Sequence, residues 1–129
     1  MADKTRLKDK VVIVTGGGSG IGKGASERIG YEGGCVAVVD MRMALAEEVA
    51  SRIQSDGGRA IPIHCNVAIE TDVEAAVATT VAEFGSLHGM VANAGTAGSG
   101  WIHETAVEDW HAVLAVNLTG PFLCAKHAI

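Results

Sequence analysis

Short apolar runs alternate along the chain with longer segments in which apolar residues recur every three or four positions. The apolar runs are rich in β-branched residues and lie at Lys10–Thr15, Cys35–Asp40, Arg59–Cys65 and Gly89–Asn93. Such runs predict short strands that are buried on both faces. The periodic segments predict four helices, at 21 to about 31, 43–56, 70–84 and from about 107 onward. The inward faces are expected to carry Val73, Val77, Val81 and Phe84 in the third helix and Trp110, Val113 and Leu114 in the last.

Strands that alternate with helices predict a parallel sheet with helices on both faces, joined by right-handed crossovers. Pro62 lies within the third strand and has no N–H to donate, so this strand is expected at an edge of the sheet. The helical pattern continues to Ile129 without a glycine cap. Because a doubly wound sheet usually adds strands after the fourth, we expect residues 1–129 to be the first half of a larger domain, incomplete at its C-terminus.

Composition narrows the class of protein. Of the 129 residues, 48% are hydrophobic and 19% are charged, which predicts a packed core rather than disorder. The net charge of −5 argues against a nucleic-acid partner, because nucleic-acid binders are basic. No apolar run exceeds five residues, so we expect no membrane span. The three cysteines are odd in number and far apart, which predicts buried reduced thiols in the cytoplasm, with neither a disulfide nor a metal site.

A glycine-rich segment joins the first strand to the first helix, with the sequence Thr15-Gly16-Gly17-Gly18-Ser19-Gly20-Ile21-Gly22. A turn that only glycine permits, placed at the positive end of a helix, presents bare amides to a pyrophosphate. Ser19 is expected to contact phosphate, since no histidine and aspartate pattern accompanies it as a nucleophile. A purely structural glycine turn is the alternative, but the position between a strand and a helix favours a nucleotide.

Asp40 ends the second predicted strand, 18 residues after Gly22. An acidic side chain at this place can accept hydrogen bonds from the ribose 2′-OH of NAD. The alternative is a cap for the helix that begins near Met43. The strand's carboxyl end lies beside the glycine loop in this kind of sheet, which favours the ligand role.

Three motifs in this order resemble the short-chain dehydrogenase/reductase family: the glycine loop, Asn93-Ala94-Gly95 after the fourth strand, and Asn117-x-x-Gly120 in the last helix. The resemblance covers 6–129 and implies a Rossmann-like fold that binds a dinucleotide. It implies the following cofactor contacts: Gly16, Gly18, Ser19, Gly20, Ile21 and Gly22 around the pyrophosphate, Asp40 at the adenosine ribose, Asn66 and Val67 at the adenine, and Asn93, Ala94 and Gly95, a segment that supports the sheet, beside the cofactor's ribose. It also implies that Asn117 orders a water of the proton relay.

The resemblance implies an NAD(H)-dependent oxidoreductase that acts on a secondary alcohol or its ketone and forms a homo-oligomer, with NADP the less favoured cofactor. The family's catalytic tyrosine, the lysine four residues after it and the serine are absent, because the sequence ends before their segment; the only tyrosine is Tyr31. The 129 residues alone are therefore expected to be inactive. The alternative is a nucleotide-binding or interaction fragment without turnover.

Three positions depart from the family's pattern. Asn66 replaces an aspartate, Ala92 replaces the first asparagine of Asn-Asn-Ala-Gly, and His88 replaces a commonly acidic residue at the surface. None of these changes removes cofactor binding. Trp101 and Trp110 are expected in the core or in an interface, with the wall of a substrate cleft as the alternative.

Overall fold

The computed structural model describes residues 3–129. The strands are β1 (Val11–Thr15), β2 (Cys35–Asp40), β3 (Arg59–His64) and β4 (Gly89–Val91). The α-helices are α1 (Gly20–Tyr31), α2 (Met43–Ser55), α3 (Glu70–Phe84), α4 (Val107–Leu114) and α5 (Gly120–Ala128). A 3-10 turn, η1 (Ile102–Glu104), precedes α4, and a π-helical segment, η2 (Ala115–Thr119), joins α4 to α5. The predicted alternation of strands and helices is confirmed.

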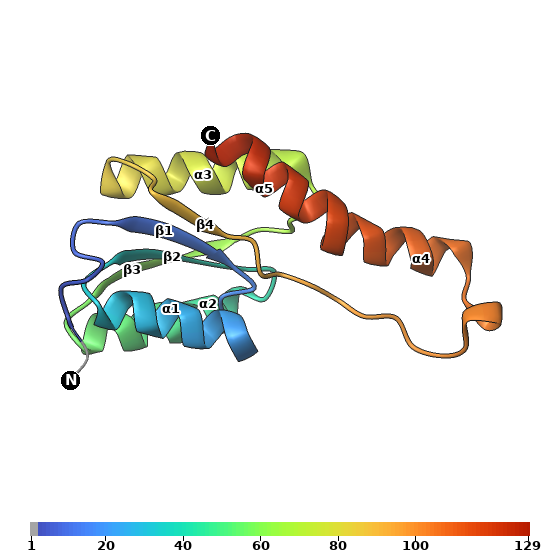
Figure 1. Cartoon of the computed structure of the whole chain (residues 1–129), viewed down its shortest axis with the longest axis horizontal. Coiled ribbons are helices and arrows are strands. Elements are labelled where there is room, and N and C mark those ends of the chain that lie inside the picture. Colours follow the sequence, from blue (N-terminus) through green and yellow to red (C-terminus); the bar gives the residue numbers. More distant parts are fainter. Residues whose placement is uncertain (1–2) are drawn as a thin grey trace.

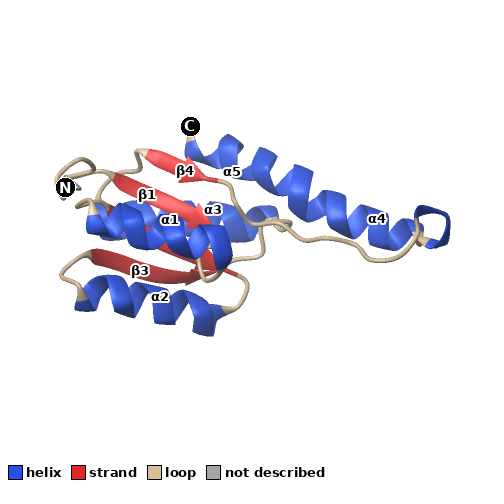
Figure 2. Ribbon diagram, turned by 60° about the horizontal axis from the view of Figure 1, so that its bottom comes forward, coloured by secondary structure: helices blue, strands red, loops and turns tan. Residues whose placement is uncertain are grey.

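The four strands form one parallel sheet in the order β3-β2-β1-β4. Helices α1 and α2 cover one face of the sheet, and α3 and α5 cover the other (Figures 1 and 2). Strand β3 is at the edge, as Pro62 predicted. After β3 the chain returns to the far side of β1, so the direction of strand addition reverses between β1 and β4. This arrangement is the Rossmann-like, doubly wound fold that the sequence predicted.

Alternating residues of the central strands supply two separate hydrophobic layers. Ile13, Ala37 and Val39 belong to the layer under α3 and α5, whereas Val14 and Val38 belong to the layer under α1 and α2. Every residue of β2 is buried. The continuous apolar run of β2 thus reflects burial on both faces, because side chains on a strand alternate between them.

The last helix differs from the prediction of one continuous inward-facing helix. It contains the π-helical segment η2, in which the Gly120 N–H donates to the Ala115 carbonyl five residues back. Pro121 has no N–H and cannot continue the α-helical pattern at this place. Helix α4 also extends beyond the sheet (Figure 1), so the prediction that Trp110 packs inward is wrong, and its side chain is 52% exposed.

Helix α3 buries a slightly different face from the one predicted. Val73, Ala76 and Thr80 are its buried residues, whereas Val81 is exposed. Thr80 tolerates burial because its hydroxyl donates to the Ala76 carbonyl within the helix (2.8 Å). The buried face of α3 is therefore rotated by about one residue from the predicted face, which was assigned from the hydrophobicity of Val81.

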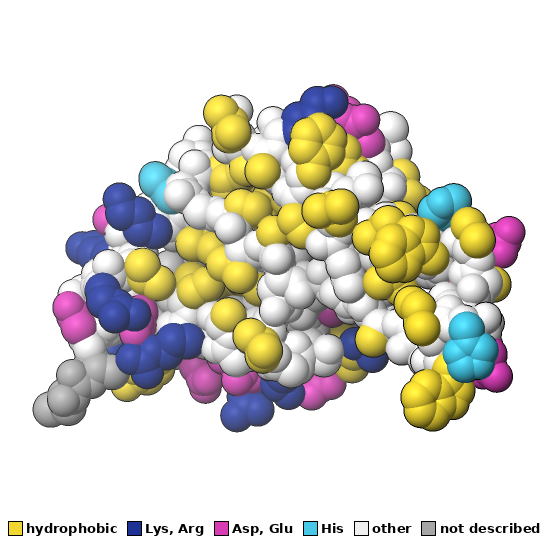
Figure 3. All heavy atoms as spheres, turned by 45° about the vertical axis from the view of Figure 1, so that its right-hand side comes forward, with side chains coloured by type: hydrophobic (Ala, Val, Ile, Leu, Met, Phe, Trp, Pro, Cys, Tyr) yellow, Lys and Arg dark blue, Asp and Glu magenta, His cyan; other side chains and the backbone are white. Residues whose placement is uncertain are grey.

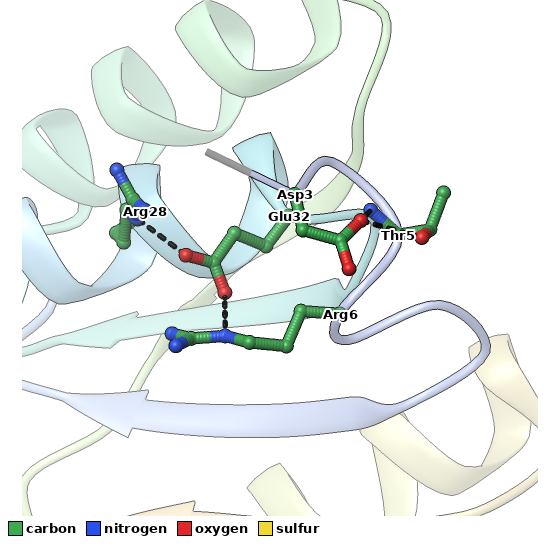
Figure 4. Close-up of polar contacts among 5 residues, drawn as sticks. All are labelled: Asp3, Thr5, Arg6, Arg28 and Glu32. Atoms are coloured by element: carbon green, nitrogen blue, oxygen red, sulfur yellow. Dashed lines mark hydrogen bonds and ion pairs between the residues drawn. The ribbon is translucent and has the colours of Figure 1, made fainter. Parts of the chain in front are cut away.

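A buried carboxylate fastens the N-terminal segment to the end of α1 (Figure 4). Glu32 is 1% exposed, and its two oxygens accept hydrogen bonds from Arg6 Nε (2.5 Å) and Arg28 Nε (2.6 Å). Burial acts to raise the pKa of Glu32, but the hydrogen bonds from Arg28 and Arg6 outweigh it, so the pKa lies below its usual range. The Leu7 N–H also donates to the Glu32 carbonyl (2.9 Å).

Candidate functional site

Most of the predicted site residues gather around a cavity at the carboxyl ends of the strands, whereas Gly18, Gly20, Ile21, Gly22 and Asn117 lie outside its lining. This cavity has a volume of about 450 Å³. It is lined by Gly16, Ser19, Asp40, Met41, Arg42, Cys65, Asn66, Val67, Asn93, Ala94, Gly95, Thr96, Ala112 and Val116. Ligands of open parallel sheets bind in the crevice where the strand order reverses, which here lies between β1 and β4.

The glycine loop between β1 and α1 is held by close backbone packing. A Cβ on Gly16 would lie 2.9 Å from the Ala94 Cα, and its φ of +62° already favours glycine. A Cβ on Gly22 would collide with the Gly16 carbonyl oxygen. Ser19 precedes α1 in an extended conformation and makes no side-chain cap. The first amides of α1 therefore have no side-chain cap from Ser19, and helix N-termini of this kind can stabilise an anion.

Two further members of the loop occupy opposite environments. Gly18 is buried, and a Cβ there would lie 2.7 Å from the Leu45 Cβ. Ile21, in the first turn of α1, is 85% exposed. This apolar side chain at the start of α1 is open to solvent and does not line the cavity. Gly20, at the start of α1, has a φ of +53° and nothing within 4 Å of its Cβ position.

Asp40 is buried at the end of β2 and contacts the glycine loop directly. Its Oδ2 accepts the Gly18 N–H (3.0 Å), and its Oδ1 accepts the Arg42 N–H (2.9 Å). The residue at the cap position of α2 is Arg42, so Asp40 does not serve as that cap. Arg42 also donates from Nη2 to Ser19 Oγ (2.9 Å), and its Nε lies 3.7 Å from Asp40 Oδ1. A carboxylate and a guanidinium thus stand together at the mouth of the cavity.

The segment after β4 is clamped to the end of β1, 78 residues earlier in the chain. The hydroxyl of Thr15 accepts the N–H groups of Asn93 and Ala94, each at 3.0 Å. The Asn93 side chain donates from Nδ2 to the carbonyls of Thr15 (3.0 Å) and Gly16 (3.4 Å). Ala92, where the family has asparagine, is exposed. Thr15 was missed as a site residue, although a hydroxyl that ends an apolar strand just before the loop was a signal for it.

Asn66 and Val67 follow β3 at the far side of the cavity. Asn66 Oδ1 accepts the Ala68 N–H (3.0 Å), and its backbone N–H donates to Asp72 Oδ2 (3.0 Å). The turn therefore uses the side-chain oxygen and leaves Nδ2 as the group that can donate to a ligand. Val67 is buried and supports Gly120, whose Cβ would lie 2.8 Å from Val67 Cγ2.

Asn117 lies in η2 and holds the loop that follows Gly95. Its Oδ1 accepts the Thr96 N–H (2.8 Å), and its Nδ2 donates to the Thr96 carbonyl (2.7 Å). Both polar atoms of the side chain are thereby used. The Asn117 carbonyl has no α-helical donor, because residue 121 is proline. The π turn falls at this residue, and π turns often mark functional positions.

The other features of the described chain give weaker indications of a functional site. A larger hollow, of about 590 Å³, lies between the C-terminal ends of α1 and α2, near Arg59 at the start of β3. None of the predicted site residues lines it. Within residues 3–129, no three histidine, cysteine or acidic side chains are placed to share a metal ion. Over the same residues, no helix has both the length and the apolar character to cross a bilayer. Cys35, Cys65 and Cys124 are buried and unpaired, as predicted, and burial raises the pKa of Cys65 to about 12.

The comparisons with known proteins agree with this geometry. The family described as short chain dehydrogenase matches residues 10–129, and the chain belongs to this family. 2-(S)-Hydroxypropyl-CoM dehydrogenase 3 of Xanthobacter autotrophicus is 39% identical over 124 residues, which cover 96% of this chain and 49% of that protein. Momilactone A synthase of Oryza sativa is 41% identical over 129 residues, which cover 98% of this chain and 46% of that protein.

The fold is shared with a solved reductase of about twice the length. The crystal structure of 3-ketoacyl-(acyl-carrier-protein) reductase from Brucella melitensis, complexed with NADH, matches with a TM-score of 0.89 and 33% identity. The match covers 95% of this chain and 50% of that chain. The chain therefore spans about half the length of the relatives that it matches. It has the Rossmann-like sheet of an oxidoreductase family that binds nicotinamide dinucleotides.

Proposed function

We propose that the chain forms the NAD(H)-binding portion of an oxidoreductase that interconverts a secondary alcohol and its ketone. The observation that carries this proposal is the position of Asp40, buried at the end of β2 with its carboxylate against the glycine loop. The relatives named above as a dehydrogenase and a reductase support the reaction class. We also propose that residues 1–129 act as one nucleotide-binding unit, cytoplasmic and homo-oligomeric.

The residues that line the cavity have the chemistry to hold a dinucleotide. The backbone of Gly16 to Gly22, with Ser19 and Ile21, would hold the pyrophosphate at the start of α1. Asp40 would accept hydrogen bonds from the hydroxyls of the adenosine ribose after releasing its hydrogen bond from the Gly18 N–H. Asn66 Nδ2 would donate to the adenine, whose ring would lie against Val67. Asn93, Ala94 and Gly95 would support the ribose near β4.

The bound cofactor would supply the hydride, and the protein would supply position and protons. In this chain, the Asn117 side chain fixes Thr96, which lines the cavity, and we propose that Asn117 orders a water of a proton relay. The only tyrosine, Tyr31, is at the end of α1, on the edge of the sheet away from Asp40. A positioned proton donor contributes about 10²–10⁴-fold to such reactions. We therefore propose that these 129 residues alone bind nucleotide without turning over a ketone.

The binding test is a calorimetric titration of NADH into the chain. We expect saturable binding at one site. Gly16→Val should abolish it, because the new Cβ would lie 2.9 Å from the Ala94 backbone. Gly24→Ala is the matched control, since its Cβ would meet nothing within 4 Å. If the parent chain binds no NADH while folded by circular dichroism, the proposal fails.

The second candidate function is an inactive fragment, and it is favoured for these residues because the family's catalytic tyrosine and the lysine four residues after it are not among them. Loss of NADH absorbance with a panel of ketones distinguishes the two. No turnover is expected from the chain alone, and turnover is expected when a separately expressed C-terminal half of a family member is added. Turnover by the purified chain alone that survives Asn117→Ala would show that an unrecognised acid is present.

A further inference from the structure

The hollow between the C-terminal ends of α1 and α2 is larger than the cavity beside the glycine loop, and the proposed function makes no use of it. Its volume is about 590 Å³, against about 450 Å³ for that cavity. Helices α1 and α2 lie side by side on one face of the sheet (Figure 2). The hollow is therefore a groove between two helices that the sheet itself holds in place, and we call it the α1–α2 hollow.

Glycines shape the α1–α2 hollow, since six of its fourteen lining residues are glycine. A Cβ on Gly30 would lie 2.6 Å from Ile53 Cγ2, and a Cβ on Gly58 would lie 2.7 Å from the same atom, so close packing requires glycine at both positions. Gly24, within α1, is different, because a Cβ there would meet nothing within 4 Å. Glycine inside a helix is less stable than alanine, so helix stability does not explain Gly24. Its missing side chain keeps one wall of the hollow open.

The lining of the α1–α2 hollow is basic, although the chain as a whole has a net charge of −5. It holds two acidic side chains and four basic ones, which are Lys4, Arg28, Arg52 and Arg59. In the space-filling view, Lys and Arg side chains gather at the end of the molecule where α1 and α2 finish, whereas the end formed by α4 shows mainly hydrophobic side chains (Figure 3). An excess of one charge around a hollow raises the local concentration of ions of the opposite charge.

The two arginines of the helices keep most of their hydrogen-bond donors free. Within residues 3–129, Arg28 donates only from Nε, to Glu32. Arg52 Nε lies 3.5 Å from Glu27 Oε1, and this buried oxygen accepts no hydrogen bond from any described residue. The contact is thus an ion pair without a hydrogen bond, and the N–H groups of Arg52 remain available to a ligand.

The other two basic residues carry charge that no described acid neutralises. Over residues 3–129, Lys4 and Arg59 form no ion pair. Lys4 Nζ lies 4.9 Å from the centre of the Tyr31 ring, and the Arg59 guanidinium lies 5.3 Å from the centre of the Phe84 ring. An aromatic ring positions a cation but leaves its charge in place.

The helix dipoles account for only a part of this arrangement. Arg28 and Arg52 lie in the last turns of α1 and α2, where a positive charge is favourable. Lys4 and Arg59 belong to neither helix, yet they line the same hollow. The grouping of all four therefore requires another explanation.

We infer that the α1–α2 hollow binds a small organic anion that carries at least two carboxylate or phosphate groups. One group would lie beside Lys4 and Arg28, which share the ring of Tyr31 at 4.9 and 5.6 Å. The second group would lie beside Arg52 and Arg59, which come from α2 and from the start of β3. The planar guanidinium fork matches the paired oxygens of either group. An anion with a single charged group would reach only one of these two pairs.

This inference is independent of the proposed NADH binding. The α1–α2 hollow and the cavity beside the glycine loop have no lining residue in common. The same preparation can be titrated with NADH, so failure of one proposal does not imply failure of the other.

Calorimetric titration of the 129-residue chain at constant ionic strength is the test. Citrate and 2,3-bisphosphoglycerate are the probes, and the tighter of the two decides between carboxylate and phosphate groups. We expect one saturable site for the tighter probe and no saturation by acetate over the same concentrations. Saturable binding of neither probe, or equal binding of acetate, overturns the inference.

A charge variant locates the bound anion. Arg52→Gln should weaken binding of the tighter probe about fivefold, as the loss of one exposed ion pair does. Lys10→Gln is the matched control, because it removes the same charge from an exposed residue outside the lining, and it should leave binding unchanged. Equal weakening by both variants would show attraction to the overall charge alone and would overturn the site.

A space-filling variant tests the same site without changing a charge. Gly24→Phe should abolish binding of the probe, because its ring would occupy the hollow, whereas Gly24→Ala should retain it. Circular dichroism checks that each variant is folded. If Arg52→Gln loses the parent's spectrum, the Gly24 pair decides. Binding by folded Gly24→Phe as tight as by the parent overturns the inference.

Discussion

Asp40 is expected to make the site prefer NADH to NADPH. The 2′-phosphate of NADPH would stand where the ribose hydroxyl of NADH meets the Asp40 carboxylate. At about 4 Å, two like unit charges repel by about 4 kcal/mol at an effective dielectric of 20, and by about 1 kcal/mol in bulk water. The higher figure applies to Asp40, because only 5% of its surface is exposed.

Arg42 offsets a part of this repulsion. Its guanidinium lies 3.7 Å from Asp40 Oδ1, but its side chain is 64% exposed. Its attraction for a phosphate is therefore closer to the value in water, about 1 kcal/mol. The repulsion exceeds the attraction, and we expect NADH to bind at least about tenfold more tightly, a difference of about 1.4 kcal/mol.

The assay is calorimetric titration of both cofactors into the parent chain and three variants. Asp40→Asn keeps a hydrogen-bond acceptor and removes the charge, so it should narrow the preference. Arg42→Ala should widen it. Asp56→Asn, at the other end of α2, is the control and should change nothing. Equal or tighter binding of NADPH by the parent would refute the reasoning. So would a change of the preference for NADH in the same direction in Asp40→Asn and in Arg42→Ala.

Three smaller effects follow from single contacts. Asn117→Ala removes two hydrogen bonds to the loop, each about 1 kcal/mol, and should speed limited proteolysis at 96–104, whereas Thr119→Ala should not. The pKa of Glu32 is lowered in the folded chain, so the stability that its ionised carboxylate contributes is complete above the ordinary glutamate range and is lost as the pH falls below about 4. Glu32→Gln should flatten that part of the acid denaturation profile, and an unchanged profile would contradict this prediction. His88→Leu leaves the Val11 N–H without its acceptor and should lower the free energy of unfolding by about 1–2 kcal/mol, and His88→Asn should cost less.

Local patterns were sufficient to predict the sheet and most of its helices. Strands β1 and β2 are short and buried on both faces, so each appears in the sequence as an apolar run, and glycine pairs end α1 and α2. The edge position of β3 followed from Pro62 alone, because a proline cannot donate to a neighbouring strand. These features depend on residues close together in the chain, and the fold inherits them directly.

Contacts between distant segments could not be read from the sequence. The hydroxyl of Thr15 and the amides of Asn93 and Ala94 are 78 and 79 residues apart, and only the folded sheet brings them together. His88 is a second example. The sequence marked it only as a departure from the family's pattern at the surface and did not indicate its contact with Val11. Its Nδ1 accepts the Val11 N–H (2.9 Å), and its own N–H donates to the Val11 carbonyl (2.8 Å). An acceptor is what this position requires, and a carboxylate or an imidazole can provide it.

Asn93 and Asn117 both use their side chains to bind backbone groups, on opposite sides of the site. Asn93 binds the carbonyls at the end of β1 and so fixes the glycine loop, whereas Asn117 binds both main-chain groups of Thr96 and so fixes the opposite wall. Because both side chains form their hydrogen bonds with backbone groups, the proposed ligand contacts fall to the amides of the glycine loop and to the Asp40 carboxylate. Because Gly16 and Thr96 both line the cavity, the two asparagines fix its two walls through backbone groups of the chain.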